Sequence, residues 1–151
     1  VYALFPWMSG YATYAESFTG AADATTLSGA TLDPEVNEGL EGGLRFYLLE
    51  NQVQASVTYY DNTKQNIRQD GAGADINEIW TDLGRPDRVP LNYRDTSANT
   101  GTGWEFEVVG NPIVGLRLTA NFALPEAIQT QGLQETAAYF NANRAAWEQA
   151  A

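Results

Sequence analysis

Apolar and polar residues alternate with a period of two along five stretches, which is the periodicity of a β-strand with two unlike faces. The stretches are residues 8–14, 40–48, 53–60, 104–109 and 116–124, and residues 1–5 resemble the tail of a sixth. The division is clearest over residues 40–48, where Leu40, Leu44 and Phe46 share one face while Glu41 and Arg45 share the other. The pattern predicts an all-β protein with an antiparallel sheet of five to six strands.

The links between these stretches alternate between short and long. Tight turns are expected at Pro6-Trp7, Glu50-Asn51-Gln52 and residues 111–114, and long links at residues 19–37, at 63–102 and from Pro125 to the end. Short periplasmic turns and long external loops are typical of a transmembrane β-barrel. A soluble sandwich usually has shorter links throughout. We therefore expect a barrel segment with apolar faces toward lipid, polar faces toward the lumen and acidic loops outside.

Two of the long links contain helical patterns. Asp75 is expected to be an N-cap, with Glu78 as the third helical residue and Ile79, Trp80 and Leu83 on an apolar face before Gly84. Residues 133–151 are rich in Ala, Glu and Gln, with an interruption expected at Arg144. Both segments predict short helices within long loops.

Charge and composition exclude several classes of function. The 151 residues contain 8 Lys plus Arg and 19 Asp plus Glu, and this net charge of -11 repels nucleic-acid phosphate, so no nucleic-acid partner is expected. The sequence has no Cys and no His, which excludes disulfides, thiolate nucleophiles and Cys/His metal sites. No stretch of 18 consecutive apolar residues is present either. We expect no cofactor, no metal and no catalytic residue.

Four local patterns have a functional and an ordinary interpretation. Glu105 and Glu107 share a strand face and could act as paired acid and base on a glycoside, but a water-facing strand has the same pattern. Residues 71–75 faintly resemble a calcium-binding glycine repeat, or a flexible turn before a helix. Residues 101–103 precede a strand rather than a helix, so they predict a loop and not a phosphate cradle. Lys64 is expected in a solvated loop.

The two faces of the predicted sheet suggest different surroundings. Tyr14, Tyr59 and Trp104 lie near strand ends on the apolar face, where an aromatic girdle would lie. Polar-face residues would point into the lumen, where they pack against one another or contact a ligand. The lumen-facing candidates are Glu41, Arg45, Tyr60, Glu105, Glu107 and Arg117.

Several segments resemble, in the same order, successive strands in the later part of TonB-dependent receptor barrels. They are YATYAESF at 11–18, LDPEVNEGLEGGLRF at 32–46, ASVTYYDNTKQNI at 55–67 and GWEFEVVGNPIVGLRLTANF at 103–122. The tracts RPDRVPLNYRDT at 85–96 and NANRAAWE at 141–148 resemble a branch with long helical external loops.

The resemblance implies a transport protein of the outer membrane of a Gram-negative bacterium, not an enzyme. It implies uptake of a scarce bulky ligand, such as a ferric siderophore, cobalamin or an oligosaccharide, with TonB acting through a plug domain. Residues 1–151 would be a partial barrel domain, because closing such a barrel takes about 22 strands. No plug domain and no TonB box are expected among these residues. Its partners would then be outer-membrane lipid and the rest of the barrel and plug. Ligand contacts follow no fixed motif in this family, so no binding residue is transferred.

Two alternatives remain open at this point. A soluble β-sandwich that binds carbohydrate through exposed Tyr and Trp would pack its apolar faces together in a dry core. A glycoside-acting enzyme would place Glu105 or Glu107 in a cleft.

Overall fold

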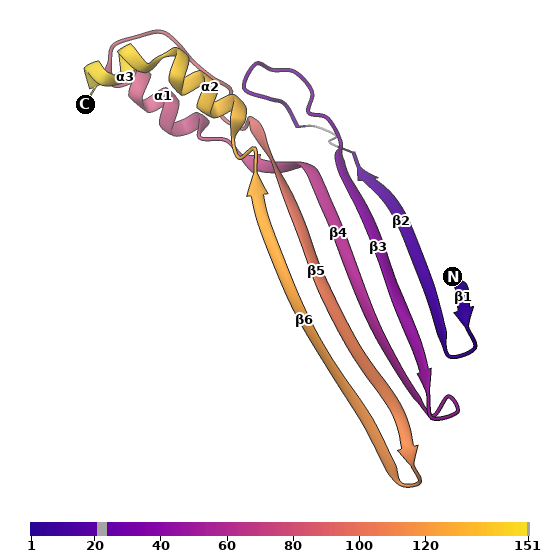
Figure 1. The fold of residues 1–151 in the computed structure, drawn as a ribbon. Helices are drawn as coiled ribbons and strands as arrows, with labels where there is room; N and C mark the ends of the chain where they lie inside the picture. Colours follow the sequence, from indigo (N-terminus) through magenta and orange to yellow (C-terminus); the bar gives the residue numbers. More distant parts are fainter. Residues whose placement is uncertain (21–23, 151) are drawn as a thin grey trace. The chain divides into compact units, whose positions relative to one another are not determined.

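The computed structural model describes residues 1–20 and 24–150 and contains one six-stranded sheet (Figure 1). Strands neighbouring in the chain are neighbours in the sheet, in the order β1-β2-β3-β4-β5-β6, and β1 pairs antiparallel with β2. The strands are β1 Tyr2–Phe5, β2 Met8–Thr19, β3 Glu35–Leu48, β4 Val53–Asp70, β5 Arg94–Ile113 and β6 Leu116–Thr130. The predicted all-β antiparallel architecture is confirmed.

The strands are longer than the alternating stretches. β4 continues to Asp70 and β5 begins at Arg94, so the long link expected at 63–102 covers only residues 71–93. Residues 61–70 are polar except for Ile67 and give no alternation, although their backbone still pairs. β6 likewise runs past Pro125; proline cannot donate a ladder hydrogen bond, and β6 pairs only with β5 among the described strands.

Positive backbone angles mark two of the tight turns. The link after β3 places Leu49, Glu50 and Asn51 at φ values of 51°, 55° and 69°. The turn expected at residues 111–114 was placed too early, because β5 extends to Ile113 and the chain reverses at Val114-Gly115. Gly115 has a φ of 82°, which glycine adopts without steric cost and most other residues do not.

The chain divides into two compact units. The first, here the strand unit, comprises residues 1–17, 37–63 and 100–128. The second, here the loop unit, comprises the described residues within 18–36, 64–99 and 129–151.

The strand unit is a single layer with an uncovered apolar face. Aromatic rings lie beside one another on this face, with centroids 5.1 Å apart for Tyr59 and Trp104 and 6.3 Å apart for Phe106 and Phe122. They nevertheless stay exposed, as the 60% accessibility of Phe122 shows. The described residues of this unit supply no second layer, so the dry core expected of a soluble sandwich is not formed.

The loop unit holds three helices, α1 Gly73–Asp82, α2 Gln134–Ala142 and α3 Arg144–Ala150. The prediction of Asp75 as N-cap was wrong, since the cap is Ala72, three residues earlier, and it makes no side-chain cap bond. Asp75 instead lies in the first turn, where its charge still favours the positive end of the helix dipole. The C-terminal helical segment is broken at Asn143, which caps α2, one residue before the interruption expected at Arg144.

The loop unit has its own small core. Ile76, Trp80 and Tyr93 are completely buried, with Val89 nearly so. The Trp80 ring lies 4.4 Å from that of Trp147, and the Arg85 guanidinium covers Trp80. Among the described residues, no helix has the length and apolar character needed to cross a membrane.

Candidate functional site

Tyr11 links three strands on the polar face of the strand unit. Its hydroxyl donates to Glu41 Oε1 at 2.8 Å and lies 2.7 Å from Thr58 Oγ1, so the Thr58 hydroxyl is left to donate to Tyr11. The guanidinium of Arg45 lies 5.8 Å from the centroid of the Tyr11 ring. Two predicted lumen residues, Glu41 and Arg45, are therefore both held through one tyrosine that the sequence pattern did not single out.

Two tyrosines on this face lie over glycines of the next strand. A Cβ at Gly103 would come within 2.6 Å of Tyr60 Oη, and one at Gly43 within 2.9 Å of the Tyr11 ring. An aromatic ring that covers a cross-strand glycine protects backbone that the missing side chain would leave bare. Gly103 therefore lies inside β5 beneath Tyr60, and the expectation that residues 101–103 form a loop was wrong.

The remaining candidates lie elsewhere on the strand unit. Glu105 and Glu107 are exposed on β5 and line a surface depression with Asn121. Arg117 is exposed beside the turn, near Gln52. The structure thus joins Glu41 with Arg45 through Tyr11 and distributes the other four candidates along the face, rather than gathering all six at one point.

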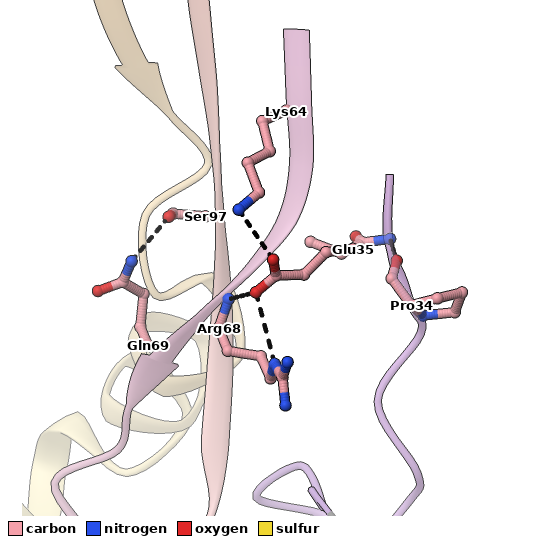
Figure 2. A network of polar contacts seen from close by, with 7 residues as sticks. Pro34, Glu35, Lys64, Arg68, Gln69 and Ser97 are labelled. Carbon is pink, nitrogen blue, oxygen red and sulfur yellow. Dashed lines mark hydrogen bonds and ion pairs between the residues drawn. The ribbon is translucent and has the colours of Figure 1, made fainter. Parts of the chain in front are cut away.

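A second polar network lies in the loop unit (Figure 2). Glu35 accepts hydrogen bonds from Lys64 Nζ at 2.9 Å, from the backbone N–H of Arg68 at 3.2 Å and from Arg68 Nε at 3.4 Å. The Lys64 bond, with help from Arg68, holds the pKa of Glu35 below its ordinary value. Lys64 therefore belongs to β4 and an ion pair, which corrects the expected solvated loop.

Asp95 is the most deeply buried acid of the loop unit's network around α2, with 3% of its surface exposed. Its carboxylate accepts the backbone N–H groups of Thr136 at 2.7 Å, Thr96 at 2.8 Å and Glu135 at 3.4 Å. Burial raises the pKa of Asp95, but bonds from the Thr136 hydroxyl and these N–H groups outweigh it, and the net pKa is lowered. The sequence offers no local signal for this role, because two of the three backbone partners, Glu135 and Thr136, lie about 40 residues away.

Metal chemistry finds no support in the part of the chain that the structure describes. Residues 1–20 and 24–150 contain no cluster of three or more acidic, His or Cys side chains placed to hold a metal ion. For residues 71–75 the structure favours a turn before a helix over a calcium-binding repeat, since Gly71 lies against the Tyr93 ring and Gly73 begins α1.

Comparison with known protein families gives a match over nearly the whole chain. The model of the family "TonB dependent receptor-like, beta-barrel" matches residues 1–148. The chain belongs to the TonB-dependent receptor β-barrel family. A search of curated proteins gives no match.

Solved structures share the fold. The ferripyoverdine receptor of Pseudomonas aeruginosa is 18% identical, with a TM-score of 0.66 over 85% of this chain and 16% of that one. FpvAI in complex with pyocin S2 is 19% identical, with a TM-score of 0.67 over 87% and 17%. The alcaligin outer-membrane receptor FauA of Bordetella pertussis is 20% identical, with a TM-score of 0.61 over 85% and 21%. The chain spans about a fifth or less of these proteins.

Family membership accounts for the single-layer sheet. Proteins of this family are outer-membrane receptors and transporters rather than enzymes, and a barrel wall has one face toward lipid and one toward the lumen. The carbohydrate-binding sandwich is not favoured, because the fold is shared with receptor barrels and the described residues of the strand unit supply no second layer.

Proposed function

We propose that this chain forms part of the barrel wall of a Gram-negative outer-membrane receptor that imports a ferric siderophore. The observation that carries the proposal is the family match over residues 1–148 to a sheet that is apolar on one face and polar on the other. Siderophore is preferred over cobalamin or oligosaccharide because the similar structures include a ferripyoverdine receptor and an alcaligin receptor.

In this proposal the polar face lines the lumen and the apolar face contacts lipid. Residues 1–151 are one part of the barrel domain, and the remaining wall, the plug and TonB are partners. A lumen can solvate or pair charges, which suits the Arg45 and Glu41 pair around Tyr11 as well as the exposed Glu105, Glu107 and Arg117. Tyr60 lies on the same face, on β4, which is the strand between β3 and β5 in the sheet.

Uptake by the complete receptor tests the proposal. Iron-starved cells expressing the full-length receptor in a background without other siderophore receptors are given radioactive iron bound to pyoverdine, to alcaligin or to other siderophores. We expect accumulation from at least one of them, and none in a matched strain that lacks TonB. Accumulation of cobalamin or oligosaccharide instead, or uptake of iron that persists without TonB, would contradict the proposal.

Lumen-facing residues are tested with the same assay. Glu105→Gln and Arg45→Gln remove charge from the polar face without changing side-chain length greatly, while Ala120→Ser on the apolar face serves as the control. If the polar face meets the ligand path, the two charge variants lower the uptake rate at subsaturating siderophore with unchanged receptor abundance, and the control does not.

A further inference from the structure

The first turn of α2 is held by a carboxylate from a distant strand. Asp95, at the start of β5, accepts hydrogen bonds from the backbone N–H groups of Glu135 and Thr136, and Thr136 is itself buried, with 8% of its surface exposed. Helix N-termini leave such N–H groups without partners inside the helix, and α2 has no side-chain cap of its own because Leu133 occupies the cap position. Residues 131–150 thus depend on β5 for the start of their helix.

Glu135 continues the chain of contacts to a third segment. Its two carboxylate oxygens accept the backbone N–H groups of Leu27 at 3.0 Å and Ser28 at 3.1 Å. The Arg94 N–H donates to the Thr25 carbonyl at 2.8 Å, which ties the same segment to the start of β5. Residues 24–34 are therefore attached both to α2 and to the strand that carries Asp95.

The segment before β5 is joined to the same helices by buried groups. Tyr93 Oη lies 3.0 Å from Thr136 Oγ1 and accepts the N–H of Ala72 at 3.2 Å. Trp80 Nε1 donates to Tyr139 Oη at 2.8 Å, and the Trp80 ring lies beside the ring of Trp147. The packed core of residues 71–93 is therefore completed by side chains of α2 and α3.

We propose that the segments of residues 24–34, 71–93 and 131–150 form one cooperative unit that opens and closes as a whole, with Asp95 and Glu135 holding it together. Each segment is short, and hydrogen bonds join each of them to another segment or to the start of β5. Charge-assisted hydrogen bonds from N–H groups to a buried carboxylate are the stronger kind, and losing a partner leaves a buried group unsatisfied. Native proteins open locally in cooperative units, and the shared buried contacts couple these segments into one such unit. The inference concerns the loops alone and does not depend on which ligand the receptor takes.

Hydrogen exchange of the full-length receptor, read by mass spectrometry, tests this directly. Asp95→Asn keeps the side-chain shape but removes the charge that accepts three N–H groups. We expect hydrogen exchange to become faster by about tenfold in all three segments together, because segments that open as one unit share one opening free energy. Faster exchange confined to residues 131–150, or no change in any segment, would overturn the proposal.

A second pair of variants keeps the test decisive if Asp95→Asn fails to assemble. Glu135→Gln weakens the contacts to Leu27 and Ser28, whereas Glu148→Gln alters only an exposed ion pair with Arg144. We expect Glu135→Gln to speed exchange in residues 71–93 as well as in 24–34, and Glu148→Gln to leave residues 24–34 unchanged. Acceleration in residues 24–34 alone would show independent loops and refute the cooperative unit.

Discussion

Asp95 is a carboxylate that stays charged although almost none of its surface reaches solvent. Desolvation disfavours an isolated buried charge, but the Thr136 hydroxyl and three backbone N–H groups favour the ionised form. β5 has 20 residues and a strand crosses a bilayer with about 9–11, so Asp95, at the end away from the tight turn, lies outside the proposed membrane span.

A pH effect on α2 follows from the lowered pKa of Asp95. Because the folded pKa lies below the ordinary value of 3.8, the stabilisation is fully present above that value and is lost as pH falls through the lower folded pKa. A spin label on Ala138→Cys, an exposed site of α2, should stay immobile from pH 7 to about pH 4 and gain mobility below it. With Asp95→Asn added, the label should be mobile at pH 7 already; equal pH profiles would contradict the assignment.

Gly71 lies so close to the Tyr93 ring that no added Cβ fits. Tyr93 is completely buried and cannot move aside, so Gly71→Ala should destabilise the loop unit by about 1–3 kcal/mol through overpacking. The matched control is Gly20→Ala, where a Cβ would meet nothing within 4 Å. Hydrogen exchange of α1 in the full-length receptor measures the difference, and equal exchange in the two variants would show that Tyr93 yields.

At the scale of elements, alternation along the sequence located the strands but not their ends. Residues 40–48 contrast Leu44 and Phe46 with Glu41 and Arg45, and they lie inside β3 as expected. The polar part of β4 and the start of β5 have no such contrast, because neither face there consists of apolar residues. The network of Glu35 with Lys64 and the bonds of Asp95 join residues from separate strands and helices, and only the fold brings them together.

The candidate site was predictable to a similar extent. Period-two alternation placed Glu41 and Arg45 on one face correctly, but it could not show that Tyr11 holds them together. That contact depends on the register between β2 and β3, which turn geometry and packing set and which a single strand does not encode.

An added charge should disrupt assembly on one face of β6 and be tolerated on the other. Phe122 belongs to the apolar face and its neighbour Asn121 to the polar face, and both are exposed in this sheet. If the apolar face meets lipid, Phe122→Arg costs about 2–4 kcal/mol near the bilayer midplane, while Asn121→Arg reaches water in the lumen. Heat-modifiable gel mobility of the full-length receptor should show loss of assembled barrel for Phe122→Arg alone. Loss of assembled barrel for Asn121→Arg alone would mean that the face of Asn121, and not that of Phe122, contacts lipid.

At the scale of the whole molecule, the sheet leaves hydrogen-bonding groups at both edges. β1 and β6 each pair with one described neighbour, so one side of each strand offers unpaired N–H and C=O groups. Such groups are costly in a bilayer and must be paired by further strands of a closed wall. The apolar face adds exposed side chains such as Leu118 and Phe122, which water does not favour.

These open edges lead to a prediction for residues 1–151 produced alone. Without the remaining wall the polypeptide should associate edge to edge or through its apolar face, so that sedimentation in detergent-free buffer shows large heterogeneous species. The full-length receptor in detergent, carrying the same residues, should instead give one monodisperse species, because closure pairs every strand. A soluble, monodisperse monomer of 16.5 kDa from the isolated chain would contradict the wall assignment. It would mean that the apolar face finds its cover within these residues, as a sandwich requires.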